Sequence, residues 1–196
     1  LAPVMTTAGG YRTTVLDRRI NSTLDGTLLS ASLGLPLGTN DVIVPSPLLL
    51  VRNDALLAAA GLDVGDKGAV KVPRLLAHLN VARRLSVRWI ASIHELPGLI
   101  PRVRGEYFVF EDPQALPRAR VVPCVRGVAN ADEAYSATLE EDPRGTVVIE
   151  GGTTTCAEGA VATAVPAEIT EYLDTAVTIL ASGPGTLVVA DMNYPG

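Results

Sequence analysis

A proline-bounded corner at residues 112–122 constrains the fold of this chain more than any other stretch. Its sequence is DPQALPRARVV, and it follows an alternating aromatic and β-branched run at residues 106–110 that predicts a β-strand. Pro113 and Pro117 each fix φ and remove a backbone donor, so the middle of the stretch cannot continue a hydrogen-bonded ladder. Extended chain resumes at residues 118–122. The sequence therefore predicts a strand, a rigid corner and a second strand, with the corner redirecting the chain between an α/β first half and a β-rich second half.

Before the corner, strand and helix patterns alternate. We expect strands at residues 11–16, 41–44 and 86–92, with a Pro/Gly-rich loop at residues 94–104. Helices are expected at residues 47–60, ending at Gly61, and at residues 73–84, opening at Pro73. This order predicts an α/β fold, in which a mixed sheet is flanked by helices.

After the corner, strand patterns dominate. Asn130 and Glu133 have the spacing of a capping box, which predicts a helix to about residue 141. We expect strands at residues 146–150, along the whole of 168–180, and at 186–190, with the last two forming a hairpin across the turn at 182–185. The chain would then comprise an α/β domain at 1–123 and a β-rich segment at 124–196, the start of a β-sandwich, or one continuous domain.

Composition excludes several classes of partner. The chain has 196 residues, of which 47% are apolar and 19% charged, so it should be ordered around a core of small aliphatic side chains. A net charge of −5 disfavours binding to nucleic acid. No stretch approaches the roughly 20 apolar residues of a membrane span, and the first residues do not resemble a signal peptide. We therefore expect a soluble fragment of a longer protein.

No catalytic constellation stands out in the sequence. The chain lacks GxSxG, and neither histidine has sequence context tying it to Cys156 in the loop at 151–156. His94 and Glu95 lack the second histidine of a zinc-protease helix, and we predict no metal and no cofactor. The candidates for ligand contact are charged residues near strand ends and the corner, where solvated charges and turn chemistry are the alternative explanation: Asp17, Arg18, Arg19, Glu111, Asp112 and Arg118. The carboxylates Glu111 and Asp112 would suit a cation or a sugar hydroxyl.

Cys124 and Cys156 are the only cysteines. A structural disulfide would fit an oxidising compartment, whereas two buried free thiols would fit a reducing one. The sequence alone leaves both possibilities open.

Three stretches, in order, resemble segments of YfhO-like bacterial membrane proteins. Residues 110–122, FEDPQALPRARVV, resemble the family's ENPxALPRA segment, and residues 85–91, LSVRWIA, resemble its preceding LGVRYV strand. Residues 187–196, LVVADMNYPG, resemble a strand that ends in YPGW, and residues 45–52 are similar to the upstream helix entry. The resemblance covers most of residues 40–196. Asp112 stands where the family has Asn, and Trp89 where it has Tyr.

The resemblance implies a polytopic parent similar to GT-C glycosyltransferases, which use a polyprenyl-phosphate sugar at the outer face of the membrane. No catalytic residue of that class maps onto this chain. It is therefore expected to be a non-catalytic extracytoplasmic domain that positions an acceptor glycan or cell-envelope polymer, or braces the membrane core of the same polypeptide. That location favours a bridge between Cys124 and Cys156. The alternative is a free-standing soluble α/β enzyme or small-ligand-binding domain.

Overall fold

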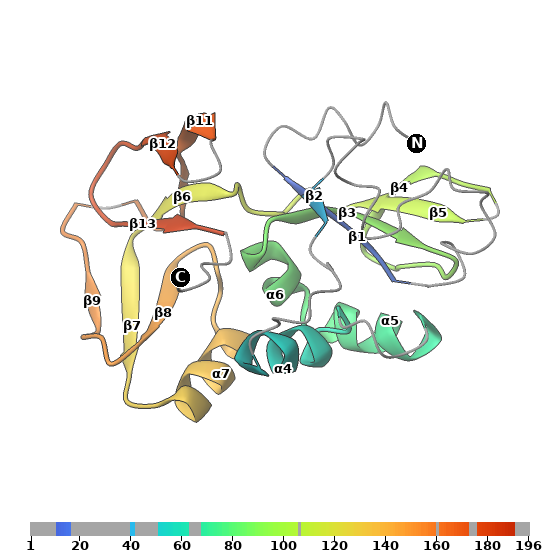
Figure 1. Ribbon diagram of the computed structural model, residues 1–196, viewed down its shortest axis with the longest axis horizontal. Helices are drawn as coiled ribbons and strands as arrows, with labels where there is room; N and C mark the ends of the chain where they lie inside the picture. Colours follow the sequence, from blue (N-terminus) through green and yellow to red (C-terminus); the bar gives the residue numbers. More distant parts are fainter. Residues whose placement is uncertain are drawn as a thin grey trace. The chain divides into compact units, whose positions relative to one another are not determined.

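The chain folds into two compact units, residues 1–115 and 116–196 (Figure 1). The computed structural model describes residues 11–16, 40–41, 51–62, 68–105, 107–159, 161–172 and 176–190. Helices and several mixed sheets, with strands concentrated after residue 116, confirm the predicted α/β class. The boundary between the units lies inside the proline corner, and strand β6 (Ala119–Val122) pairs with β10 and β13, which both follow it in the chain.

The first unit contains a five-stranded mixed sheet with the order β2-β1-β3-β5-β4. Its strands are β1 (Arg12–Val15), β2 (Asn40–Asp41), β3 (Val87–Ser92), β4 (Ile100–Val103) and β5 (Phe108–Glu111). β1 runs parallel to both β2 and β3, whereas β5 is antiparallel to β3 and β4. In the central strand β3, every residue except Arg88 is buried, so β3 is covered on both of its faces.

Strand β4 corrects the prediction of a loop at residues 94–104. A proline at position 101 argues against a strand in the middle of a sheet, because it cannot donate to a neighbour. Within the described part of the chain, β4 is an edge strand and pairs with β5 alone, and edge strands are where a sheet tolerates a proline.

Three helices lie on the same side of this sheet, as Figure 1 shows: α4 (Val51–Ala59), α5 (Gly68–Ala77) and α6 (Leu79–Arg84). Gly61 follows α4 with a φ of +66°, which confirms the predicted C-terminal cap. The predicted start of a helix at Pro73 is wrong, since α5 begins at Gly68 and carries Pro73 inside it. Pro73 is exposed, and its missing N–H removes one backbone hydrogen bond from the helix. Among the described residues, no helix is both long and apolar enough to span a bilayer.

The second unit contains two three-stranded sheets and one separate hairpin. One sheet has the order β10-β6-β13 and the other β8-β7-β9, while β11 and β12 pair with each other. The strands after β6 are β7 (Cys124–Val128), β8 (Thr146–Glu150), β9 (Thr155–Cys156), β10 (Val165–Pro166), β11 (Glu168–Tyr172), β12 (Val177–Leu180) and β13 (Thr186–Val189).

Helix α7 (Ala131–Glu140) connects the parallel strands β7 and β8. Its start confirms the predicted capping box: the Asn130 side chain accepts a hydrogen bond from the backbone N–H of Glu133 at 2.9 Å. The Glu133 carboxylate accepts in turn from the backbone N–H of Ala129 at 3.0 Å. Two backbone donors near the helix start are thereby satisfied.

Two strand predictions for this unit are wrong. Residues 168–180 form the hairpin β11–β12 rather than one long strand, and β13 pairs with β6 rather than with the strand before it. The alternating pattern is the same for one long strand and for two strands joined by a turn, so the sequence pattern could not separate them. Gly185 allows the close approach to β6, because a Cβ there would lie 2.5 Å from the carbonyl oxygen of Val122.

Candidate functional site

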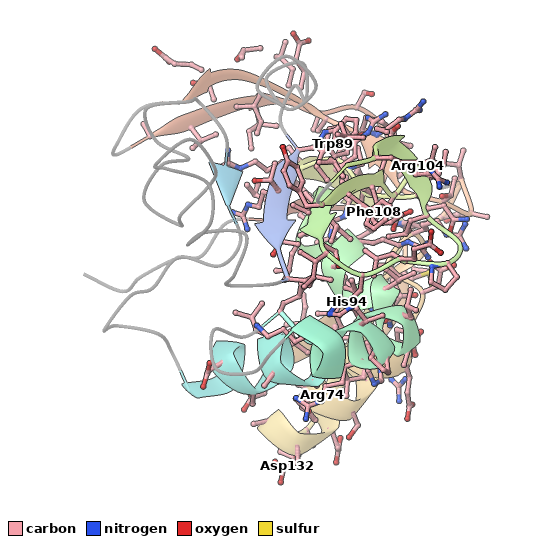
Figure 2. The ribbon with its side chains drawn as sticks, turned by 90° about the vertical axis from the view of Figure 1, so that its right-hand side faces the viewer. Arg74, Trp89, His94, Arg104, Phe108 and Asp132 are labelled. Atoms are coloured by element: carbon pink, nitrogen blue, oxygen red, sulfur yellow. A yellow bond between two sulfur atoms is a disulfide. The ribbon has the colours of Figure 1, made fainter. Side chains whose placement is uncertain are left out.

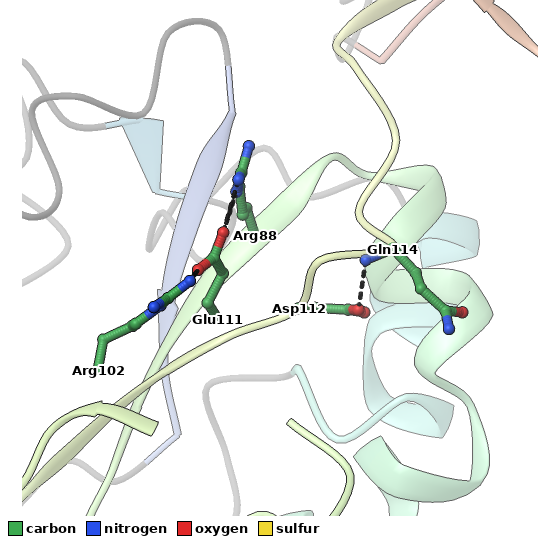
Figure 3. Close-up of polar contacts among 5 residues, drawn as sticks. All are labelled: Arg88, Arg102, Glu111, Asp112 and Gln114. Atoms are coloured by element: carbon green, nitrogen blue, oxygen red, sulfur yellow. Dashed lines mark hydrogen bonds and ion pairs between the residues drawn. The ribbon is translucent and has the colours of Figure 1, made fainter. Parts of the chain in front are cut away.

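Glu111, the last residue of β5, is the centre of a charged cluster in the first unit. Its side chain is only 5% exposed. The Oε1 atom accepts hydrogen bonds from Nε and Nη2 of Arg88 at 2.8 and 2.6 Å. The Oε2 atom accepts from Nε of Arg102 at 2.6 Å and lies 2.5 Å from its Nη2. We call Arg88, Glu111 and Arg102 the arginine clamp (Figure 3).

Two β-bulges place the arginines on either side of Glu111. The residues before and after Arg88 pair with consecutive residues of β1, so Arg88 is the extra residue of a bulge. The residues before and after Arg102 likewise pair with consecutive residues of β5. A bulge interrupts the regular alternation and redirects a side chain. Because β5 lies between β3 and β4, the two bulges bring one guanidinium to Glu111 from each neighbouring strand.

Aromatic side chains border the clamp. The Cζ atom of Arg88 lies 4.8 Å from the centre of the Tyr11 ring and 5.9 Å from that of Trp89, within the range of cation–π contacts. Trp89 pairs directly with Glu111 across β3 and β5 and is only 7% exposed; Figure 2 shows it on the sheet of the first unit. Its indole N–H has no hydrogen-bond partner in the described part of the chain.

The clamp carries a net positive charge at neutral pH. Burial raises the pKa of Glu111, but hydrogen bonds and charges from Arg88 and Arg102 outweigh it, so the pKa lies below its usual value of 4.5. The carboxylate is therefore ionised and neutralises only one of the two guanidinium groups. A bound cation would have to displace an arginine from Glu111, so the cluster favours anions.

Asp112, the residue after Glu111, binds a different arginine and the backbone of the turn. Its Oδ2 accepts from Nε of Arg83 on α6 at 2.7 Å, and its Oδ1 accepts from Nη2 of Arg83 at 3.3 Å. Oδ1 also accepts from the backbone N–H of Gln114 at 2.9 Å (Figure 3), and the Asp112 carbonyl accepts from the N–H of Ala115 at 3.2 Å. Asp112 therefore closes the Asp–Pro turn and ties α6 to the start of the corner.

The other predicted contact residues do not join the clamp. Asp17, Arg18 and Arg19 lie outside the described residues. Arg118 belongs to the second unit, where its carbonyl accepts from the N–H of Ala190 at 2.8 Å.

Sequence reasoning picked out the two carboxylates but missed the arginines that hold them: Arg83, Arg88 and Arg102. One signal was present. Arg88 interrupts an apolar run at residues 87–91 of β3, and Glu111 ends β5 after three apolar residues. A charged residue within a buried strand generally has a partner of opposite charge.

In the second unit, Cys124 of β7 and Cys156 of β9 are direct cross-strand neighbours and form a disulfide. It fastens the two-residue strand β9 to the middle strand of its sheet. No group of three or more His, Cys, Asp or Glu side chains suited to a metal ion occurs in the described ranges.

The chain matches no protein-family model, no curated protein and no solved structure.

Proposed function

We propose that this chain is a non-catalytic extracytoplasmic domain of a polytopic, glycosyltransferase-like membrane protein. In this proposal it positions an acceptor glycan or cell-envelope polymer, or braces the membrane core of the same polypeptide. The disulfide between Cys124 and Cys156 is the observation that carries the proposal. Structural disulfides persist in oxidising compartments and are rare where glutathione and thioredoxin keep thiols reduced.

The arginine clamp supports a holding role for this part of the chain. A general acid or base works best with a pKa near the operating pH, whereas the pKa of Glu111 is lowered by its two arginines. Both oxygens of Glu111 are occupied by guanidinium donors. Its carboxylate therefore fixes side chains in position and is poorly suited to moving protons.

The location can be tested in cells that carry the complete gene. Intact spheroplasts are treated with an external protease, and the thiols of a matched sample are trapped with a maleimide before and after reduction. We expect cleavage within this domain in unbroken spheroplasts, and thiol labelling only after reduction. Protection from the protease together with thiols that react without reductant would place the domain in the cytoplasm and overturn the proposal.

The non-catalytic role needs a separate measurement. The purified chain is incubated with activated sugar donors and envelope oligosaccharides, and products are sought by mass spectrometry. We expect binding without any covalent change. Turnover by the purified chain, together with its recovery in the soluble fraction of cells, would favour the free-standing α/β enzyme instead.

A further inference from the structure

We infer that the arginine clamp binds an oxyanion, a phosphate or a carboxylate, carried by the glycan. The identification of the ligand as a glycan rests on the proposed function. The preference for an anion rests on the geometry of Arg88, Arg102 and Glu111 and stands without it.

The first argument is charge. Two guanidinium groups share one carboxylate, so one positive charge in the clamp has no counter-ion within it. The side chains of Arg88 and Arg102 are 34% and 48% exposed, while that of Glu111 is 5% exposed. A ligand can thus reach the two guanidinium groups, whereas the Glu111 carboxylate is buried.

The second argument is that both arginines are held in place before any ligand arrives. Each guanidinium uses Nε and Nη2 on Glu111, which leaves Nη1 of each without a partner among the described residues. Arginine donors match the oxygens of phosphate and carboxylate and form strong charge-assisted hydrogen bonds. Because Glu111 already fixes the side chains, binding an anion costs less conformational entropy than ordering two free arginines.

The third argument is the setting of the clamp. Trp89 pairs directly with Glu111, and the centre of its ring lies 5.9 Å from Cζ of Arg88. The Tyr11 ring supports the Arg88 guanidinium at 4.8 Å. These cation–π contacts help to fix the direction of the Arg88 guanidinium before an anion binds.

The fourth argument is how charge divides along the chain. Residues 1–115 contain twelve Lys and Arg against ten Asp and Glu, whereas residues 116–196 contain four against eleven. The overall charge of −5 therefore comes from the second unit alone. An anionic ligand is repelled there and is accepted by the first unit, where the clamp lies.

The test measures binding of the complete chain to three soluble probes of similar length by titration calorimetry. These are a glycerol-phosphate oligomer, an oligogalacturonate and a neutral malto-oligosaccharide. Arg102→Gln and Arg88→Gln each remove one donor group, and Arg144→Gln removes a comparable arginine from an exposed ion pair with Asp142 in the second unit. We expect each clamp variant to weaken anion binding about 10- to 100-fold, the range for losing a hydrogen bond to a charged group, and Arg144→Gln to leave it unchanged. Added salt should also weaken binding of the native chain.

The outcomes separate the sources of the anion. Tight binding of the glycerol-phosphate oligomer alone assigns a phosphate, and tight binding of the oligogalacturonate alone assigns a carboxylate. Thermal unfolding checks that each variant is folded, and Arg102→Lys, which keeps the charge but loses the planar fork, should also bind more weakly than the native chain.

Three results would overturn the inference: binding of the neutral probe as tight as that of the anions, binding unaffected in both clamp variants, or no binding to either anionic probe. Binding to vesicles with anionic lipid but to neither oligosaccharide would overturn the assignment of the anion to a glycan. None of these results depends on where the domain lies in the cell, so failure here is distinct from failure of the localisation experiment.

Discussion

Two Asp–Pro turns in this chain, at Asp112 and Asp142, differ in the burial of the aspartate and in whether its arginine is distant or close in sequence, and they can be compared by mutagenesis. In both turns the aspartate Oδ1 accepts from the backbone N–H two residues later, at 2.9 Å for Asp112 and 3.0 Å for Asp142. Each carboxylate also pairs with one arginine, Arg83 or Arg144. The Asp112 side chain is 1% exposed, and that of Asp142 is 55% exposed.

Replacing each aspartate by asparagine keeps the side-chain oxygen of the turn and removes the charge. At Asp142 the exposed ion pair is screened by solvent, so we expect a loss of no more than about 0.5 kcal/mol. At Asp112 the charge-assisted bonds to Arg83 would be lost, and one amide N–H would be buried facing a cation. Such bonds contribute roughly 1.5–3 kcal/mol. Because Arg83 is 23% exposed and recovers part of its hydration, we expect a smaller loss of about 1–2 kcal/mol, which reaches below that range.

Urea unfolding followed by circular dichroism, together with calorimetry, would measure both variants. For a unit of this size the expected loss at Asp112 corresponds to a melting temperature about 4–8 °C lower. Asp112→Ala should be less stable than Asp112→Asn, since it also removes the turn acceptor. Equal losses for Asp112→Asn and Asp142→Asn, or native stability for Asp112→Asn, would show that the buried ion pair contributes no more to stability than the exposed one.

Three further predictions concern the clamp, the disulfide and the helix cap. Glu111→Gln should lower the free energy of unfolding by about 1–2 kcal/mol at pH 7. Because the folded pKa of Glu111 is lowered, this difference from the native chain should shrink as the pH falls below 4.5; a difference that stays constant in pH titrations of stability would contradict the assigned charge pairing. Changing Cys124 and Cys156 together to serine should destabilise the second unit by about 3–4 kcal/mol, because the disulfide closes a long loop of the unfolded chain. The stability of this variant should equal that of the reduced native chain, and a reductant should not change it further. Asn130→Ala should lower stability by about 1 kcal/mol in denaturant unfolding, and Asn130→Ser should restore most of it; if Asn130→Ser is no better than Asn130→Ala, capping is not the cause.

Local sequence patterns alone determined several parts of this fold. The prolines of the corner, the capping box at Asn130 and Glu133 and the glycine cap at Gly61 act within a few residues of the chain. Their effects depend on fixed φ angles and short hydrogen bonds. The α/β class and most strand positions followed for the same reason, since side-chain alternation is a local pattern.

Tertiary structure decided which strands pair and where the charged groups meet. Nothing near β13 in the sequence indicates that it pairs with β6, and the pattern of β4 does not show that it lies at the edge of the described sheet. The clamp joins Glu111 to arginines 9 and 23 residues away. Their contact depends on strand order and on two single-residue bulges, each of which changes where one side chain points. Strand register is set by the packing of the whole sheet, and it cannot be read from the residues next to it in the sequence.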